Sequence, residues 1–278
     1  MAEIATRSRS RRAALVQREF VRFSVSQRLE HLMTMVCFAA LLATGLPQKF
    51  SDASVSIWLV NSLGGIDNVR FIHRIFATVF IFSAFYHVGA IGLSITRGKF
   101  NPSMAPSLRD FVDALVMLRY SVGLSNSKPR FGRYDYRQKF EYWGIVYGGI
   151  IMIVTGLTLW FPTYVTRILP GEVVPAAKEM HTGEALLALL VIVTWHMYSV
   201  MLSPSHFPGD WSIFTGKISH EKIKEEHPLE YVALVGGALE ELEEAPDQVQ
   251  TPTAVAASPG NGEPERAAES TGDEPSKG

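Results

Sequence analysis

The sequence predicts an all-α integral membrane protein, a four-helix transmembrane bundle, and three observations lead to this fold class. Apolar residues gather in four long runs, charged residues lie between the runs, and basic residues are abundant only in alternate gaps. A soluble domain would mix apolar and polar residues at helical or strand periods. Runs of about 20 apolar residues are long enough to cross the hydrocarbon core of a bilayer, which is about 30 Å thick.

The four runs define the expected spans and the segments around them. A basic N-terminal arm covers residues 1–28, the membrane domain 29–205 and a cytoplasmic segment 206–239. Residues 240–278 are rich in Glu, Ala, Pro, Gly and Ser, so we expect a disordered acidic tail. No internal repeat of useful strength is apparent. Within the membrane domain the spans cover about residues 31–47, 71–95, 140–161 and 180–202.

The distribution of Lys and Arg predicts the orientation of the chain. The N-terminal arm and the segments 97–139 and 217–224 are rich in these residues, whereas 48–69 and 163–179 hold few. By the positive-inside rule, both termini and the long central connection of this multi-pass protein are cytoplasmic. The formal net charge of −1 gives no indication of a nucleic-acid partner.

The central connection contains a short amphipathic helix between the second and third spans. We expect it over Ser107 to Leu124, with Ser107 as the N-cap and Asp110 three residues later. It lies either in the membrane interface or against the cytoplasmic end of the bundle. Its apolar stripe consists of Phe111, Ala114, Leu115 and Leu118.

The single cysteine, Cys37, limits the possible cofactors. One thiol cannot form an internal disulfide or hold an iron–sulfur cluster without help from another chain. The sequence also lacks the C-x-x-C-H motif that attaches haem covalently. Any haem is therefore expected to be bound without a covalent link, as in b-type cytochromes.

The histidines are the residues that best indicate a functional site. Three of the eight (His206, His220 and His227) follow the last span, and we expect them to be ordinary surface residues. Polar groups inside a membrane are costly and are usually functional. The other five fall within the expected spans: His31, His73, His87, His181 and His196.

These five histidines fall into two layers. With the predicted orientation, His73 and His181 lie near the outer face, and His31, His87 and His196 lie toward the inner face. His181 and His196 are fifteen residues apart, which is about 22 Å along a helix and about 60° around it. The fourteen residues from His73 to His87 give about 21 Å and about 40°. Two stacked haems, each held by two imidazoles, need this arrangement.

Several motifs resemble the gamma, cytochrome b subunit of membrane-bound formate dehydrogenase and related di-haem cytochromes, from about Arg28 to Tyr231. Their order and spacing over most of the chain carry the resemblance. They are Arg28-Leu-Glu-His31, Thr44-Gly45, Arg70-Phe-Ile-His73-Arg74, Arg133-Tyr-Asp-Tyr-Arg-Gln138-Lys139, Trp143, Thr155-Gly156, Trp160-Phe-Pro162, His181, His196-Met197-Tyr198, Gly216-Lys217-Ile-Ser219 and His227-Pro228.

The resemblance implies a location in the prokaryotic cytoplasmic (inner) membrane, two haems and a quinone site. The outer haem would be held by His73 and His181, and the inner haem by His31 and His196. The family's quinone site is an Asn-x-Gly-Gln-Lys stretch beside the inner haem. The matching positions here are Asp135, Arg137, Gln138 and Lys139, of which the first two depart from the family's Asn and Gly.

Two further departures concern the inner layer. The spacing in the fourth span is one residue longer than in the family, which suggests a local bulge. His87 stands at a spacing like that in the cytochrome b of bc complexes, where two helices supply all four ligands. His87 is therefore an alternative to His31 as the partner of His196, and otherwise a candidate for proton delivery.

The resulting hypothesis is an electron-transfer subunit. It would connect an iron–sulfur or multihaem partner subunit with menaquinone or ubiquinone in the bilayer through two b-type haems. One alternative is a stand-alone cytochrome b that oxidises or reduces a small species such as superoxide. The other is a haem-free, histidine-lined transporter, which predicts a colourless protein.

Overall fold

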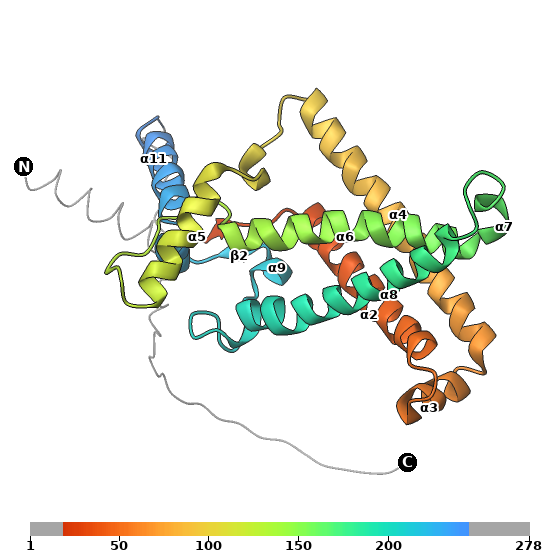
Figure 1. Ribbon diagram of the computed structural model, residues 1–278. Coiled ribbons are helices and arrows are strands. Elements are labelled where there is room, and N and C mark those ends of the chain that lie inside the picture. The colour runs from red at the N-terminus through yellow and green to blue at the C-terminus, as the bar shows by residue number, and fades with distance from the viewer. Residues whose placement is uncertain (1–18, 245–278) are drawn as a thin grey trace, which may run out of the picture. The chain divides into compact units, whose positions relative to one another are not determined.

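Four long apolar helices make up about half of the structure, a computed structural model that describes residues 19–244 (Figure 1). Each is long and apolar enough to cross a membrane. Apart from one short strand pair, the regular structure of the described residues is helical, so the predicted fold class is confirmed. The four are α2 (Val25–Lys49), α4 (Ile66–Thr96), α6 (Tyr136–Trp160) and the continuous run Val173–Leu202, which begins as α8 (Val173–Val191).

The last part of the fourth span is π-helical. Two π-helical segments follow α8 and cover Ile192–His196 and Tyr198–Leu202. A π-helical turn accommodates an extra residue within a helix, often at a functional site. The local bulge predicted for this helix is therefore present, and its first segment ends at His196.

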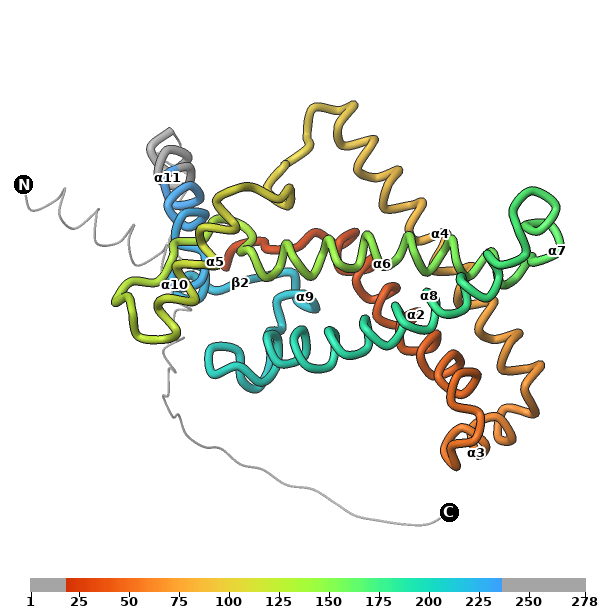
Figure 2. The backbone as a smooth tube through the Cα atoms, in the orientation of Figure 1, coloured from red at the N-terminus to blue at the C-terminus, as the bar shows by residue number. Residues whose placement is uncertain are grey.

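The long helices pack in two pairs. α2 packs along α4, and α6 packs along α8, as the paths of the backbone in Figure 2 show. Short helices lie in the connections, namely α3 (Ser54–Ser62) between α2 and α4, and α7 (Pro162–Val165) between α6 and α8. Side chains such as Phe82 and Leu190 remain exposed on the long helices, as expected for lipid-facing positions.

The predicted short helix between the second and third spans is present as α5 (Leu108–Ser121), after a 3-10 turn at Pro102–Met104. The expected cap has formed, because the backbone N–H of Ser107 donates to the Asp110 carboxylate at 2.6 Å. α5 packs against α6. Its apolar residues Leu108, Phe111, Leu115 and Leu118 are exposed.

The segment after the fourth span folds back on the residues before α2. It contains α9 (Ser212–Thr215), α10 (His220–Glu226) and α11 (Pro228–Glu244), and a two-stranded antiparallel pair joins β1 (Phe20–Val21) to β2 (Lys217–Ile218). Phe20 faces Ile218 across the pair. The acidic tail expected from residue 240 begins inside α11, and its residues from 245 onward lie outside the described residues.

A buried cluster of charged residues joins the segments that precede α2 and α6 to α11. Arg22 and Arg133 each donate to the backbone carbonyl of the other, and both pair with Glu230, at 2.5 Å and 2.7 Å respectively. His227 donates from Nδ1 to the Gly132 carbonyl at 2.7 Å, and its Nε2 faces the Arg22 guanidinium at 3.0 Å. Burial, and then the charge of Arg22, lowers the pKa of His227.

The surface position predicted for His227 is therefore wrong, and so is that for His220. Both side chains are buried, with 4% and 9% of their surface exposed. A single sequence gives no sign of this burial, because the partners of His227 come from segments about 95 and 205 residues earlier in the chain. His206 is only partly exposed and pairs with Glu226 at 3.2 Å.

Candidate functional site

Four of the five intramembrane histidines form two pairs of neighbouring rings, with interplanar angles of 66° and 40°. His73 on α4 faces His181 on α8, with ring centres 6.4 Å apart. His31 on α2 faces His196 at the end of the first π-helical segment, with ring centres 6.3 Å apart. Each pair therefore joins the α2–α4 half of the bundle to the α6–α8 half.

The separation within each pair fits one metal ion between two imidazoles. A metal–imidazole bond is about 2 Å long and the nitrogen lies about 1.1 Å from its ring centre, so two imidazoles on opposite sides of one metal have centres about 6 Å apart. The two observed values match this spacing. Two imidazoles on opposite sides are the donor set of low-spin haem iron, whereas a zinc site needs about four ligands at one point.

Threonine hydroxyls orient His73 and His181. The Thr44 hydroxyl donates to the Ala40 carbonyl at 2.7 Å and lies 2.8 Å from Nδ1 of His73. The Thr155 hydroxyl likewise lies 2.9 Å from Nδ1 of His181 and donates to a carbonyl of its own helix. Because each hydroxyl proton is already used, Nδ1–H is the donor, and this tautomer leaves the Nε2 lone pair of each histidine available for a metal.

Glycines let both rings lie against a neighbouring helix. A Cβ added at Gly45 would lie 3.2 Å from Cε1 of His73, and one at Gly156 would lie 3.2 Å from Cε1 of His181. Contacts this short would force the ring to shift. The glycines therefore set the position of the rings, while the threonines set their tautomer.

A carboxylate orients His196. Nδ1 of His196 lies 2.8 Å from Glu141 on α6, so it donates to a charged acceptor and Nε2 is again free. The His31 side chain makes no hydrogen bond to the described part of the chain. Both rings of this pair therefore have a nitrogen available.

His87 is not part of either pair. Its Nδ1 lies 2.7 Å from the Glu30 carboxylate, and its Nε2 lies 2.9 Å from the Tyr142 hydroxyl. Its ring faces the Tyr142 ring, with centres 5.9 Å apart. Both ring nitrogens are therefore engaged, and the structure brings His31, not His87, opposite His196.

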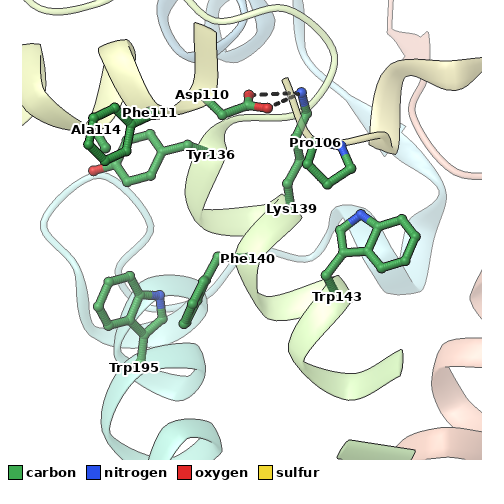
Figure 3. Close-up of a pocket in the computed structure, with 9 residues that line it drawn as sticks. All are labelled: Pro106, Asp110, Phe111, Ala114, Tyr136, Lys139, Phe140, Trp143 and Trp195. Carbon is green, nitrogen blue, oxygen red and sulfur yellow. Dashed lines mark hydrogen bonds and ion pairs between the residues drawn. The ribbon is translucent and has the colours of Figure 1, made fainter. Parts of the chain in front are cut away.

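A cavity lies between α5, α6 and the fourth span, which contributes Trp195 (Figure 3). Its volume is about 440 Å³. Lys139 and Asp110 form an ion pair at its edge, with Nζ 2.8 Å and 3.0 Å from the two carboxylate oxygens. Trp195, the residue before His196, forms part of the wall. The lining consists of Pro106, Asp110, Phe111, Ala114, Tyr136, Lys139, Phe140, Trp143 and Trp195.

The ion pair changes the chemistry of Asp110. Burial raises the pKa of this carboxyl group, but the hydrogen bonds from Lys139 and Ser107 outweigh burial, so the pKa lies below its ordinary value. The carboxylate is therefore charged at neutral pH, and the cavity has an apolar wall with one paired charge at its edge.

Of the four residues expected at a quinone site, only Lys139 lines this cavity. Asp135 is the buried N-cap of α6 and accepts from the Gln138 backbone N–H at 2.9 Å. The Gln138 side chain accepts from the Asp135 backbone, and Arg137 pairs with the Asp135 carboxylate at 2.7 Å. These three residues hold the start of the helix that presents Lys139.

Several residues that contact the histidines or line the cavity were not predicted from the sequence to belong to a functional site. Glu30, Glu141 and Tyr142 reach His87 and His196 from other helices. Thr44 and Thr155 belong to two Thr-Gly motifs, and their repeated form could have indicated a shared role. Trp195 was detectable only as the neighbour of His196.

Helices that cross a membrane and carry paired inward-facing histidines define a membrane cytochrome b. The family model described as prokaryotic cytochrome b561 matches residues 22–206, which is most of the chain. The chain therefore belongs to this family. It is a cytochrome b that acts in electron transfer, and the family implies haem b as its cofactor.

Curated relatives are similar at a lower level. The nitrate-inducible formate dehydrogenase cytochrome b556(Fdn) subunit of Escherichia coli K12 is 24% identical over 212 residues, covering 76% of this chain and 89% of the relative. The formate dehydrogenase cytochrome b556 subunit of Haemophilus influenzae is 25% identical over 221 residues, covering 80% of this chain and 86% of the relative.

Proposed function

We propose that this chain is the membrane-anchoring, di-haem cytochrome b subunit of a quinone-linked oxidoreductase. The observation that carries the proposal is the presence of two histidine pairs, each with the ring separation of a bis-imidazole metal site. The relatives named as cytochrome b subunits of formate dehydrogenase support the assignment to a complex.

The proposed ligands are His73 and His181 for one haem and His31 and His196 for the other. In three of the four, Nδ1 is held by a hydroxyl or a carboxylate so that Nε2 is free. His87 is not assigned as a ligand, because Glu30 and Tyr142 hold both of its nitrogens. Bound haem supplies one-electron transfer through its iron.

The proposed quinone site is the cavity lined by Lys139 and Trp195. A menaquinone or ubiquinone head group is a flat apolar ring with carbonyl acceptors, and such a ligand fits an apolar cavity that has few polar groups. Lys139 would donate a hydrogen bond to a carbonyl of the quinone, and Asp110 would hold Lys139 in place. The cavity wall contains Trp195, the neighbour of His196 in the sequence.

The proposed orientation follows the basic residues. The end of the bundle that contains the Arg22–Arg133 cluster would face the cytoplasm, and with it α5, α10 and α11. In this orientation His73 and His181 lie toward the opposite face, where an iron–sulfur or multihaem partner subunit would exchange electrons. The exposed apolar residues of α5 would lie in the membrane interface.

Haem counting in variants tests the ligand assignment. Purified wild-type protein should hold two b haems per chain by pyridine haemochrome and by a reduced-minus-oxidised spectrum. His31→Ala should retain one haem, and the matched variant His87→Ala should retain two. A colourless wild-type protein, folded and supplied with haem, would refute the proposal and favour the transporter.

Reoxidation of the reduced protein tests the cavity. In stopped-flow measurements with a soluble quinone analogue, Lys139→Met should lower the second-order rate constant about 10- to 100-fold, since a lost hydrogen bond to a charged group costs about 1.5–3 kcal/mol. Lys49→Met is the control, because Lys49 lies at the far end of α2. Equal rates in wild type and Lys139→Met would place the quinone elsewhere.

A further inference from the structure

The α2–α4 and α6–α8 halves of the bundle share several features. α2 and α6 both contain 25 residues and both begin with a capping box, Ser24 with Gln27 in α2 and Asp135 with Gln138 in α6. The reciprocal partners Arg22 and Arg133, just before these helices, are 111 residues apart. No repeat of useful strength is apparent from the sequence alone, and these shared features emerge from the helix ends and contacts.

Identical residues recur at the same offset along α2 and α6. Both helices carry Gln, Glu, Thr, Gly and Leu at equivalent positions. The constant offset is clear only once the ends of both helices are known, because most residues between these positions differ. The identical pairs are Gln27 and Gln138, Glu30 and Glu141, Thr44 and Thr155, Gly45 and Gly156, and Leu46 and Leu157.

The repeated residues make repeated contacts. Thr44 holds His73 as Thr155 holds His181, at 2.8 Å and 2.9 Å. Glu30 holds His87 at 2.7 Å, and Glu141 holds His196 at 2.8 Å. His73 therefore corresponds to His181, and His87 corresponds to His196. The π-helical segment Ile192–His196 accommodates the one extra residue between the second pair of equivalents.

One inward-facing position breaks the correspondence. At the common offset, the equivalent of His31 is Tyr142. The pair His31–His196 therefore has its counterpart in Tyr142–His87, whose ring centres are 5.9 Å apart compared with 6.3 Å. The Tyr142 hydroxyl lies 2.9 Å from Nε2 of His87, the atom that corresponds to the free Nε2 of His196.

We propose that Tyr142–His87 is a second inner haem position, equivalent to His31–His196, and that Tyr142 keeps it closed. The proposal rests on the assignment of His31 and His196 as ligands. Glu30 already accepts from Nδ1–H of His87, so Nε2 has its lone pair directed at Tyr142. The Tyr142 phenol donates to that lone pair and removes it from metal binding. Tyr142 thus determines which of the two inner positions holds haem.

Transfer of the ligand to the second position tests this proposal. His31→Ala should hold one haem, and His31→Ala with Tyr142→His should regain the second. The matched control is His31→Ala with Tyr142→Phe. It removes the hydrogen bond between Tyr142 and His87 without supplying an imidazole, and it should stay at one haem. Adding His87→Ala to the rescued variant should remove the second haem again. The readout is the number of haems per chain by pyridine haemochrome.

The outcomes separate this proposal from the one on which it rests. Equal haem content in the Tyr142→His and Tyr142→Phe double variants would overturn the second position and leave the ligand assignment intact. Two haems in His31→Ala alone would overturn the ligand assignment itself. Tyr142→His in the wild-type background should hold at least two haems, which shows that the substitution is compatible with folding.

Discussion

The two histidine layers of this cytochrome differ in which residues of the two halves of the bundle face each other. In the layer of His73 and His181, equivalent residues of the two halves face each other and each is held by a threonine hydroxyl. In the other layer, the equivalent residues His87 and His196 have different partners. His196 faces His31, and His87 faces Tyr142.

This difference shows how a repeated fold can hold an asymmetric pair of sites. When two halves of a bundle are equivalent, a pair formed by the same position in both halves occurs once. A pair formed by two different positions, one from each half, occurs twice. The replacement of one histidine by Tyr142 leaves a single inner pair. The residues that hold Nδ1 also differ between the two layers. A carboxylate, Glu141, holds His196, whereas neutral hydroxyls, Thr44 and Thr155, hold His73 and His181.

The largest expected effect is the loss of a ligand from the His73–His181 layer. His73→Ala and His181→Ala should each halve the haem content and leave the spectrum of the remaining haem unchanged, because the two pairs share no residue. Haem per chain and the α-band of the reduced protein provide the measurement. His206→Ala, outside the spans, is the control. Loss of both haems in His73→Ala would show that the layers depend on each other.

The next largest effect is expected at Glu141, and Glu30 provides the comparison. Glu141→Gln should weaken binding of the inner haem about 10- to 100-fold, because it removes the charged partner of a ligand. It should also raise the midpoint potential of that haem. Glu30→Gln is the matched change in the other half and should leave haem binding and potential as in wild type. The measurements are haem retention on dilution and a redox titration, and equal effects of the two variants would contradict the assignment of His196.

A smaller effect is expected for the neutral hydroxyls. Thr44→Val and Thr155→Val each remove one neutral hydrogen bond, which contributes about 0.5–1.5 kcal/mol. Haem retention in the outer layer should therefore fall less than in Glu141→Gln. An effect of Thr44→Val as large as that of Glu141→Gln would show that charge does not distinguish the two layers.

The smallest effect is expected from the glycines. Gly45→Ala places a methyl group 3.2 Å from the His73 ring and should shift the spectrum of the outer haem without loss of haem. Gly89→Ala on α4 is the control, because a Cβ there meets nothing within 4 Å. A low-temperature spectrum of the reduced protein resolves such a shift. Identical spectra for both variants would show that Gly45 does not position the ring.

The sequence was sufficient to predict the helical class, the four spans and the cap of α5. These features depend on the length of apolar runs and on local hydrogen bonds, which a single sequence contains. The bulge at His196 was also predictable, since it follows from a spacing. The pairing of His31 with His196 is consistent with the ligand set that the family resemblance implies.

What the sequence did not reveal are contacts between distant helices. The roles of Glu30, Glu141 and Tyr142 depend on which faces meet, and the buried position of His227 depends on Arg22 and Gly132. Asp135 has the sequence position of a quinone-site residue, but its side chain caps α6. The repeat was present in the sequence and becomes convincing only when the repeated contacts are known.

The most direct test of the central claim is the near-infrared magnetic circular dichroism of the oxidised protein. We predict that both haems give the low-spin charge-transfer band of bis-histidine ligation, and that Glu141→Gln shifts the band of one haem only. A high-spin haem, or a band typical of histidine–methionine or histidine–thiolate ligation, would contradict the two histidine pairs as haem sites.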